Sequence, residues 1–232
     1  GQNGDPSLQD LITKLSAIDY YKELFAFVYG SEEITEQKIQ SALSQFIRSI
    51  QSFDSKYDIG RAQVANNNAN FPNFTTQENT GKSLFSNPPI FNANSERTGG
   101  GLGCQGCHRA PEFDIDPNSK SNGIGGSING GPDFTNTRAP SLRNLVNPNG
   151  TVNGGMMHTA VITDLQAAIG HYGNLTNAAT NNTNLDNRLK PNGTAGQQLN
   201  LTGQEVNAVI AFLNTLTGND VYSNSKWGNH FP

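Results

Sequence analysis

The stretch GCQGCHR, from Gly103 to Arg109, decides the fold of this chain. It contains both cysteines of the 232-residue sequence, separated by two residues, and a histidine follows the second cysteine directly. A disulfide framework needs more cysteines at wider spacing, so this pair indicates one local chemical event. A Cys-x-x-Cys-His sequence is the attachment site of c-type haem.

The spacing of the two cysteines has a physical reason. On one helical turn, the thiols of Cys104 and Cys107 can reach the two vinyl groups at one edge of a porphyrin. The imidazole of His108 is then directed at the iron. We therefore predict one covalently attached haem c, with His108 as an iron ligand. Because the covalent bonds remove most of the entropy that the haem would gain on leaving, a loop-rich chain can retain it.

Two other uses of the cysteine pair are weaker. A zinc site needs four ligands, and besides His108 only His158, His171 and His230 remain. A thioredoxin-like redox pair requires a βαβ setting, which the sequence lacks. The haem interpretation is therefore favoured.

The composition agrees with a chain that wraps around a large group. Hydrophobic residues make up 34% of the sequence, which has 25 Gly and 11 Pro, and the mean hydropathy is −0.54. Because burial of apolar surface offsets the entropy lost on folding, this composition predicts long ordered loops around an apolar centre, which a porphyrin would supply. The net charge is −4 and the basic residues are scattered, which argues against nucleic acid as a partner. No apolar run is long enough for a transmembrane segment.

Helical patterns occupy both ends of the chain. Caps at Ser7, Asp19 and Thr35 begin three helices within residues 7–60, a short helix follows at about 77–85, one runs from Thr163 or Asp164 to about Tyr172, and the last begins at a Thr202–Glu205 capping box and ends before Gly218. No strand pattern is of comparable quality. We predict a mainly α fold, in which a helical segment at 1–75 precedes a cytochrome c-like haem domain with long ordered loops at 76–232.

The sixth position of the iron has several candidate ligands, which are Met156, Met157, His158, His171 and Tyr172. Methionine raises the reduction potential of a haem, whereas an anionic tyrosine oxygen favours ferric iron and lowers it. Spacing alone does not choose among these residues.

Several further segments occur in a recognisable order along the chain. They are GSEEIT (30–35), SFDSKY (52–57), CQGCHRAPEFDIDP (104–117), RAPSLRNL (138–145), GGMMH (154–158), LQAAIGHY (165–172), LNLTGQEV (199–206) and AFLNTLTG (211–218). In these segments the chain resembles the bacterial di-haem cytochrome c peroxidases and the related MauG-type enzymes. The match is to the C-terminal haem domain of that family and the helices that precede it.

The resemblance implies an oxidoreductase that reduces hydrogen peroxide. In the family, an N-terminal haem reacts with peroxide and a C-terminal haem stores and relays electrons, so this chain would carry the electron-relay haem. The implied partners are an upstream peroxidatic haem domain and a small electron-donor protein; a homodimer stays open. The alternative is a mono-haem cytochrome c that only carries electrons. Haem attachment to Cys-x-x-Cys-His occurs outside the cytoplasm, so the expected location is periplasmic or otherwise extracytoplasmic.

The resemblance also ranks the site residues. The peroxidases place an axial methionine where this sequence has Tyr172, and the MauG-type proteins place an axial tyrosine there, so Tyr172 is favoured over Met157 or Met156, followed by His171. Arg143 is implied as a partner of a haem propionate, and Arg138 as a weaker one.

The family also binds Ca²⁺ between its two domains through backbone carbonyls. Asn153 and Gly155 match those positions. His158 follows them as in the family, but the residues after it, Thr159 and Ala160, depart from the family pattern.

Overall fold

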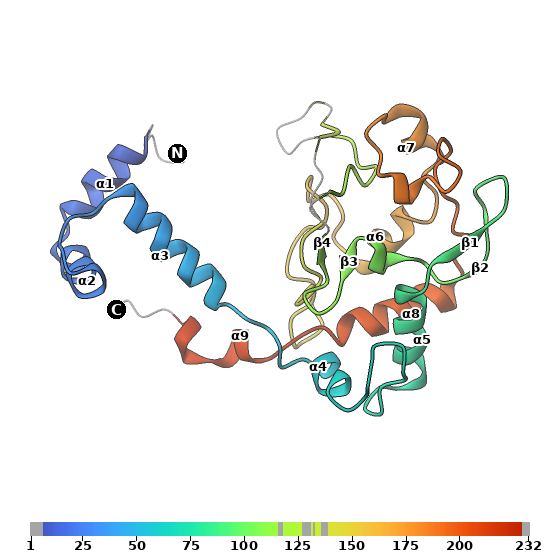
Figure 1. The fold of residues 1–232 in the computed structure, drawn as a ribbon, viewed down its shortest axis with the longest axis horizontal. Coiled ribbons are helices and arrows are strands. Elements are labelled where there is room, and N and C mark those ends of the chain that lie inside the picture. Colours follow the sequence, from blue (N-terminus) through green and yellow to red (C-terminus); the bar gives the residue numbers. More distant parts are fainter. Residues whose placement is uncertain (1–6, 116–117, 127–130, 132, 136–138, 229–232) are drawn as a thin grey trace. The chain divides into compact units, whose positions relative to one another are not determined.

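The computed structural model describes residues 7–115, 118–126, 131, 133–135 and 139–228, which are mainly α-helical with little strand (Figure 1). The predicted mainly α class is therefore confirmed. The internal contacts divide the chain into two compact units, Gly1–Gln51 and Ser52–Pro232. Within the described ranges, every helix is too short or too polar to cross a bilayer.

The first unit contains three helices, α1 (Leu8–Ser16), α2 (Asp19–Tyr29) and α3 (Glu36–Ser49). The predicted caps at the first and third are confirmed: Ser7 forms a capping box with Asp10, and Thr35 accepts a hydrogen bond from the Lys38 amide. Asp19 is not a cap, because the N-cap of α2 is Ile18, which makes no side-chain hydrogen bond.

The second unit contains the remaining elements. Its helices are α4 (Lys56–Arg61), α5 (Thr76–Ser86), α6 (Leu165–His171), α7 (Thr176–Asn181), α8 (Gly203–Asn214) and α9 (Asp220–Ser223). Its strands form two antiparallel pairs, β1 (Pro89–Phe91) with β2 (Arg97–Gly100) and β3 (His108–Arg109) with β4 (Asp114–Ile115). Single 3-10 turns lie at η1 (Cys104–Gly106), η2 (Asn187–Leu189) and η3 (Ser225–Trp227).

Three predicted helices of this unit are present with the expected starts. The Thr202–Glu205 capping box opens α8, Asp164 caps α6 by accepting from the Ala167 amide, and α5 covers the short helix expected at 77–85. Helices α4, α7 and α9 and the short strands were not predicted. Each of these helices and strands has at most six residues. Such a short segment cannot display a helical or alternating pattern of apolar residues.

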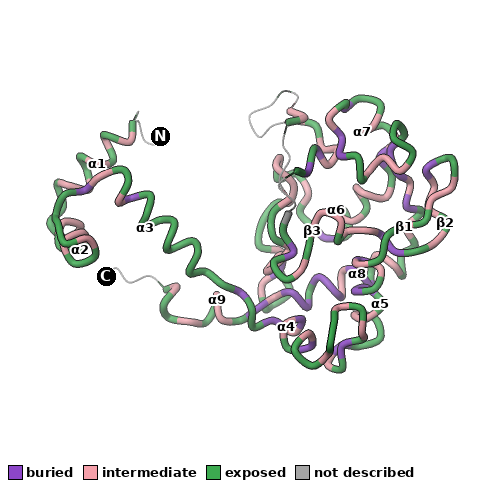
Figure 2. Tube along the Cα trace, in the orientation of Figure 1, coloured by how far each residue is buried: buried purple, intermediate pink, exposed green. Residues whose placement is uncertain are grey.

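An aromatic cluster forms the core of the second unit, with Phe212 of α8 at its centre. Its ring lies 5.1–6.5 Å, centroid to centroid, from the rings of Tyr57, Phe74, Phe85 and Phe113. Figure 2 shows buried segments along α8 and around α4 and α5, whereas α1 to α3 are mostly exposed.

The cluster also explains where the second unit begins. Tyr57, Phe71 and Phe74 belong to it, so residues 52–75 pack with the cysteine-containing unit. The contact boundary therefore lies between Gln51 and Ser52, whereas the polar composition of 61–75 had suggested a boundary at residue 75.

Helices α5 and α8 approach each other closely at Gly81. A Cβ atom added there would collide with the carbonyl oxygen of Ala208 and lie 2.9 Å from the Cβ of Phe212. We expect Gly81→Ala to lower the free energy of unfolding by about 2 kcal/mol, because overpacking outweighs the better helix propensity of alanine. Urea unfolding followed by circular dichroism measures the change.

Gly170 in α6 provides the matched control for this substitution. No atom lies within 4 Å of a Cβ added there, so Gly170→Ala should be neutral or stabilising by up to about 1 kcal/mol. Equal effects of the two substitutions would contradict the close approach at Gly81.

Candidate functional site

The two cysteines lie at the ends of one tight turn. Gly103 precedes the turn in the left-handed region, with φ of 73°, and the Cys107 amide donates to the Cys104 carbonyl at 3.1 Å. Neither cysteine forms a disulfide, and both residues are half-buried. Burial raises the pKa of the Cys104 thiol to about 12, so this thiol is protonated at neutral pH. The turn thus carries two cysteines that form no disulfide.

The imidazole of His108 is held by the backbone. His108 begins β3 opposite Ile115 of β4, and its Nδ1 lies 3.1 Å from the carbonyl oxygen of Phe113. Because a carbonyl can only accept, Nδ1 donates in this contact, and the ring has a second backbone hydrogen bond, with Pro140. Burial lowers the pKa of His108, which keeps the ring neutral. A neutral imidazole whose other nitrogen is tied to a carbonyl is the form that ligates metals.

Tyr172 follows α6, and its phenol lies near the cysteine turn. The pKa of Tyr172 is raised to about 12, mainly by burial; a hydrogen bond from Asn122 lowers it, and the neighbouring Cys107 and Cys104 raise it. The Asn122 amide nitrogen is 3.4 Å from the Tyr172 oxygen and 3.1 Å from the Met157 sulfur. Tyr172 and Met157, two of the candidates for the sixth ligand of the iron, therefore both contact the side-chain amide of Asn122.

The other candidates for the sixth position make different contacts. His171 Nε2 donates to the Asn122 carbonyl at 2.9 Å, and His158 Nε2 donates to the Gly126 carbonyl. Both nitrogens are therefore engaged with the backbone. Met156 packs against the aromatic cluster, as do Cys104 and Tyr172.

These donors fit a covalently attached haem. Two cysteines on one turn and a neutral imidazole directly after them are the groups that such a haem requires, and the Tyr172 phenol is an additional oxygen donor near them. The zinc alternative lacks support in the described residues, where no three His, Cys, Asp or Glu side chains gather to hold a metal ion. His230 lies outside those residues.

Arg143 has a different role from the predicted one. Its Nη1 and Nη2 donate to the two carboxylate oxygens of Asp58 at 2.9 and 2.8 Å, and Nε donates to the Pro111 carbonyl at 2.9 Å. Nη1 also donates to the Ser52 carbonyl, and the guanidinium lies 4.3 Å from the ring centroid of Phe53.

The side chain of Arg143 is only 7% exposed. Its guanidinium is therefore occupied inside the protein, and the structure does not support it as a propionate partner. Arg138, the weaker candidate, lies outside the described residues.

Sequence reasoning missed two residues next to the site. Asn122 contacts Tyr172 and Met157, and Arg188 donates from Nη1 to the sulfur of Cys107 at 3.3 Å. Asn122 lies in a Gly- and Asn-rich loop where no asparagine is distinguishable from its neighbours. Arg188 is separated from Cys107 by 81 positions. No local signal could have identified either residue.

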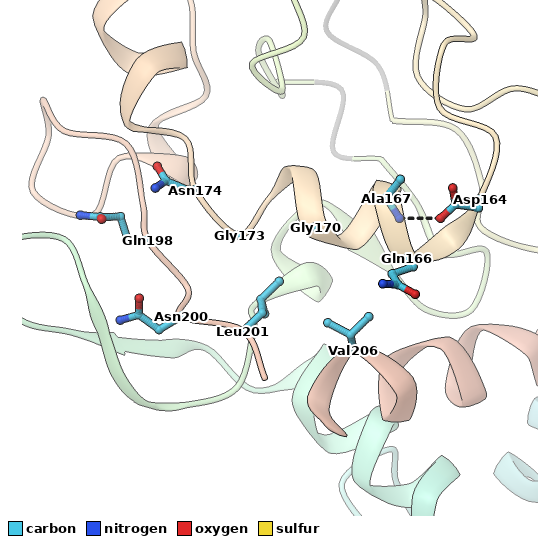
Figure 3. Close-up of a pocket in the computed structure, with 10 residues that line it drawn as sticks. All are labelled: Asp164, Gln166, Ala167, Gly170, Gly173, Asn174, Gln198, Asn200, Leu201 and Val206. Atoms are coloured by element: carbon cyan, nitrogen blue, oxygen red, sulfur yellow. Dashed lines mark hydrogen bonds between the residues drawn. The ribbon is translucent and has the colours of Figure 1, made fainter. Parts of the chain in front are cut away.

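A pocket of about 760 Å³ lies on another face of α6 (Figure 3). Gln166, Gly170 and Gly173 line it, whereas Tyr172 lies on the opposite side of the same helical turn by the 3.6-residue period. Cys104, Cys107 and His108 are not among its lining residues. This pocket is therefore distinct from the cysteine site.

The sequence of this chain is similar to those of known proteins. A sequence model described as Di-haem cytochrome c peroxidase matches residues 2–66. The methylamine utilization protein MauG of Methylophilus methylotrophus is 26% identical over 222 residues, which are 91% of this chain and 56% of that protein. The chain thus spans little more than half the length of this relative.

A solved structure shares the fold. It is the crystal structure of a MauG-like protein associated with microbial copper homeostasis, with a TM-score of 0.61 and 23% sequence identity. The similarity covers 98% of this chain and 67% of that one.

The buried ion pair of Arg143 and Asp58 generates a stability prediction. Burial, the largest single influence, raises the pKa of Asp58, but hydrogen bonds from Arg143 and Ser55 outweigh it and leave that pKa below its usual value. We expect Arg143→Met to lower the free energy of unfolding by about 3–5 kcal/mol at neutral pH, because it leaves a half-buried carboxylate without its partner. Urea unfolding between pH 3 and 8 measures this loss.

The pH dependence of the loss has a defined sign. The pKa of Asp58 is lower in the folded than in the unfolded protein. Its ionised carboxylate therefore stabilises the folded protein at a pH above the unfolded-state pKa, and this stabilisation is lost as the pH falls through the folded-state pKa. The difference between wild type and Arg143→Met should therefore shrink on acidification. The double variant Asp58→Asn/Arg143→Met should recover part of the loss at neutral pH; no recovery, with a pH-independent difference, would contradict the ion pair.

Proposed function

Since the chain belongs to the di-haem cytochrome c peroxidase/MauG family, we propose that it is the electron-relay haem portion of an oxidoreductase that reduces hydrogen peroxide. The observation that carries this proposal is the single turn that presents Cys104 and Cys107, followed directly by a neutral His108 imidazole. Family membership implies haem c, and this turn is where one haem would be attached.

The residues around the turn would hold the iron on both sides. Cys104 and Cys107 would bond the haem, and the Phe113 carbonyl would hold the His108 ring as an iron ligand. Tyr172 is the proposed sixth ligand, with Met157 as the alternative at the same amide of Asn122. A bound haem supplies a one-electron centre. If His108 and Tyr172 both held the iron, peroxide would have no place to bind, and the site would be suited to relay electrons.

The peroxide chemistry is proposed for a second haem in an upstream domain, and electrons for a small donor protein. The chain spans 56% of the MauG relative, which leaves length for such a domain in a protein of that size. Several large apolar side chains of the first unit are exposed, which supports the proposal that another domain packs against this unit. They include Phe27 at 88%, Val28 at 62%, Leu43 at 56%, Phe46 at 55% and Ile47 at 66% exposed.

Two finer features belong to the same proposal. The backbone carbonyls of Asn153 and Gly155 are proposed to contribute to a Ca²⁺ site between the two haem domains. The proposed location is the periplasm or another extracytoplasmic compartment, because haem is attached to Cys-x-x-Cys-His outside the cytoplasm.

A haem count and a turnover assay test the function together. The purified chain should exceed its polypeptide mass by one haem and show a Soret band, and Cys104→Ser/Cys107→Ser should lose both signals. The chain alone should accept electrons from a reduced cytochrome yet turn over no peroxide. The same chain preceded by its upstream haem domain should turn over peroxide.

The outcomes separate the competing functions. A mass equal to the bare polypeptide would overturn the haem site itself. Haem with no peroxide turnover in the longer protein would support a mono-haem electron carrier instead. Rapid turnover by the isolated chain would contradict the assignment of a relay role.

The identity of the sixth ligand has its own test. We expect Tyr172→Phe to change the ferric absorption spectrum and raise the midpoint potential, because loss of an oxygen ligand removes its preference for ferric iron. Met157→Leu should leave the spectrum unchanged. Tyr57→Phe is the matched control, since Tyr57 is a buried core tyrosine whose hydroxyl donates to Asn67. If Tyr172→Phe alters stability alone, as Tyr57→Phe should, Tyr172 is a core aromatic and not a ligand.

A further inference from the structure

Arg188 lies directly against the cysteine turn. Its Nη1 donates to the Cys107 sulfur at 3.3 Å, and its Cδ lies 3.8 Å from where a Cβ of Gly106 would be. The side chain therefore packs over the turn through both its aliphatic part and its charged end.

This position is built into the fold by a buried carboxylate. Asp186 has a side chain that is 7% exposed and caps η2 by accepting from the Arg188 amide at 2.9 Å. The same carboxylate accepts from the Lys120 amide at 2.7 Å and lies 3.8 Å from the Arg188 Nε. The Asp186 amide in turn donates to the Ser121 carbonyl at 2.9 Å. Arg188 is thus fixed from two sides, at its backbone and at its guanidinium.

The charge of Arg188 is permanent and partly shielded from water. Guanidinium stays protonated throughout the range in which proteins are stable, and 32% of this side chain is exposed. Asp186 offsets part of the charge. A partly exposed charge close to a redox centre still interacts electrostatically with that centre, although water and salt weaken the interaction.

We propose that Arg188 sets the reduction potential of the haem attached to Cys107, raising it against the lowering effect of an anionic oxygen ligand. This inference rests on the proposed covalent haem at Cys107. A fixed positive charge at the porphyrin edge favours the reduced iron, which carries one positive charge fewer than the oxidised iron. The guanidinium also donates a hydrogen bond to the sulfur and draws electron density from it.

The test measures the midpoint potential of the full haem-loaded chain by spectroelectrochemistry. Arg188→Gln should lower the equilibrium constant for reduction by about threefold to tenfold, where tenfold is 59 mV for one electron. Arg188→Lys should keep most of the wild-type potential, because it keeps the charge. The difference between wild type and Arg188→Gln should shrink in high salt.

Lys190 provides the matched control. Lys190→Gln changes the net charge by the same amount at the end of η2, where Lys190 is the C-cap. It should leave the potential close to that of the wild type. An equal shift in Lys190→Gln and Arg188→Gln would overturn the proposal, because the effect would then come from net charge.

A second substitution keeps the proposal testable if Arg188→Gln attaches no haem. Asp186→Asn removes the negative charge and keeps an oxygen acceptor for one of the two amides, since Oδ2 accepts from Lys120 and Oδ1 from Arg188 in the wild type; it should raise the potential. An unchanged or lowered potential would overturn the inference. A wild-type chain that carries no haem by mass would instead overturn the proposed function, so the two failures are distinguishable.

Discussion

The hydrogen bond between His108 and the carbonyl of Phe113 is the interaction on which the rest of the site depends. It joins a ligand from the cysteine turn to a residue whose ring is 2% exposed and lies 4.8 Å from Tyr57, 5.9 Å from Phe85 and 6.0 Å from Phe212, centroid to centroid. The same carbonyl accepts from the Leu142 amide. The packing of the aromatic core therefore helps to fix the position of the His108 ring. A small polar contact thus converts core packing into ligand geometry.

The features that the sequence predicted well are those recorded in a few adjacent residues. Capping boxes span four positions, and those at Ser7 and Thr202 marked the starts of α1 and α8 correctly. The Cys-x-x-Cys-His turn is equally local. Asp19 was wrongly predicted as a cap. An acidic residue in the first turn of a helix interacts favourably with the helix dipole whether or not it is the N-cap, so its presence does not fix the first residue of the helix.

The features that the sequence did not predict depend on contacts between distant residues. Arg143 is paired with Asp58, 85 positions away, and nothing around Arg143 shows that its guanidinium is already occupied. Tyr57, Phe71 and Phe74 lie in polar surroundings along the chain, so their membership in the core was hidden and the unit boundary was placed too late. Asn122 and Arg188 had no local pattern at all. A local sequence pattern indicates the backbone conformation of that segment. Which side chains contact one another is decided by the tertiary fold.

The polar composition that seemed too poor for a stable fold has a structural use around the site. Asn182 is 2% exposed and donates to the Ser121 hydroxyl at 2.7 Å, and Gln197 donates to the Tyr172 carbonyl at 2.9 Å. These side chains replace the backbone hydrogen bonds that helices and sheets would otherwise provide.

The loops beside Tyr172 and Arg188 are therefore held by specific buried contacts, although they lack regular structure. Specific buried hydrogen bonds reduce the freedom of a loop to reorganise. Paired amides hold these loops in this way without a large apolar core. Part of the asparagine and glutamine content of this chain therefore serves to hold loops near Tyr172 and Ser121 in place.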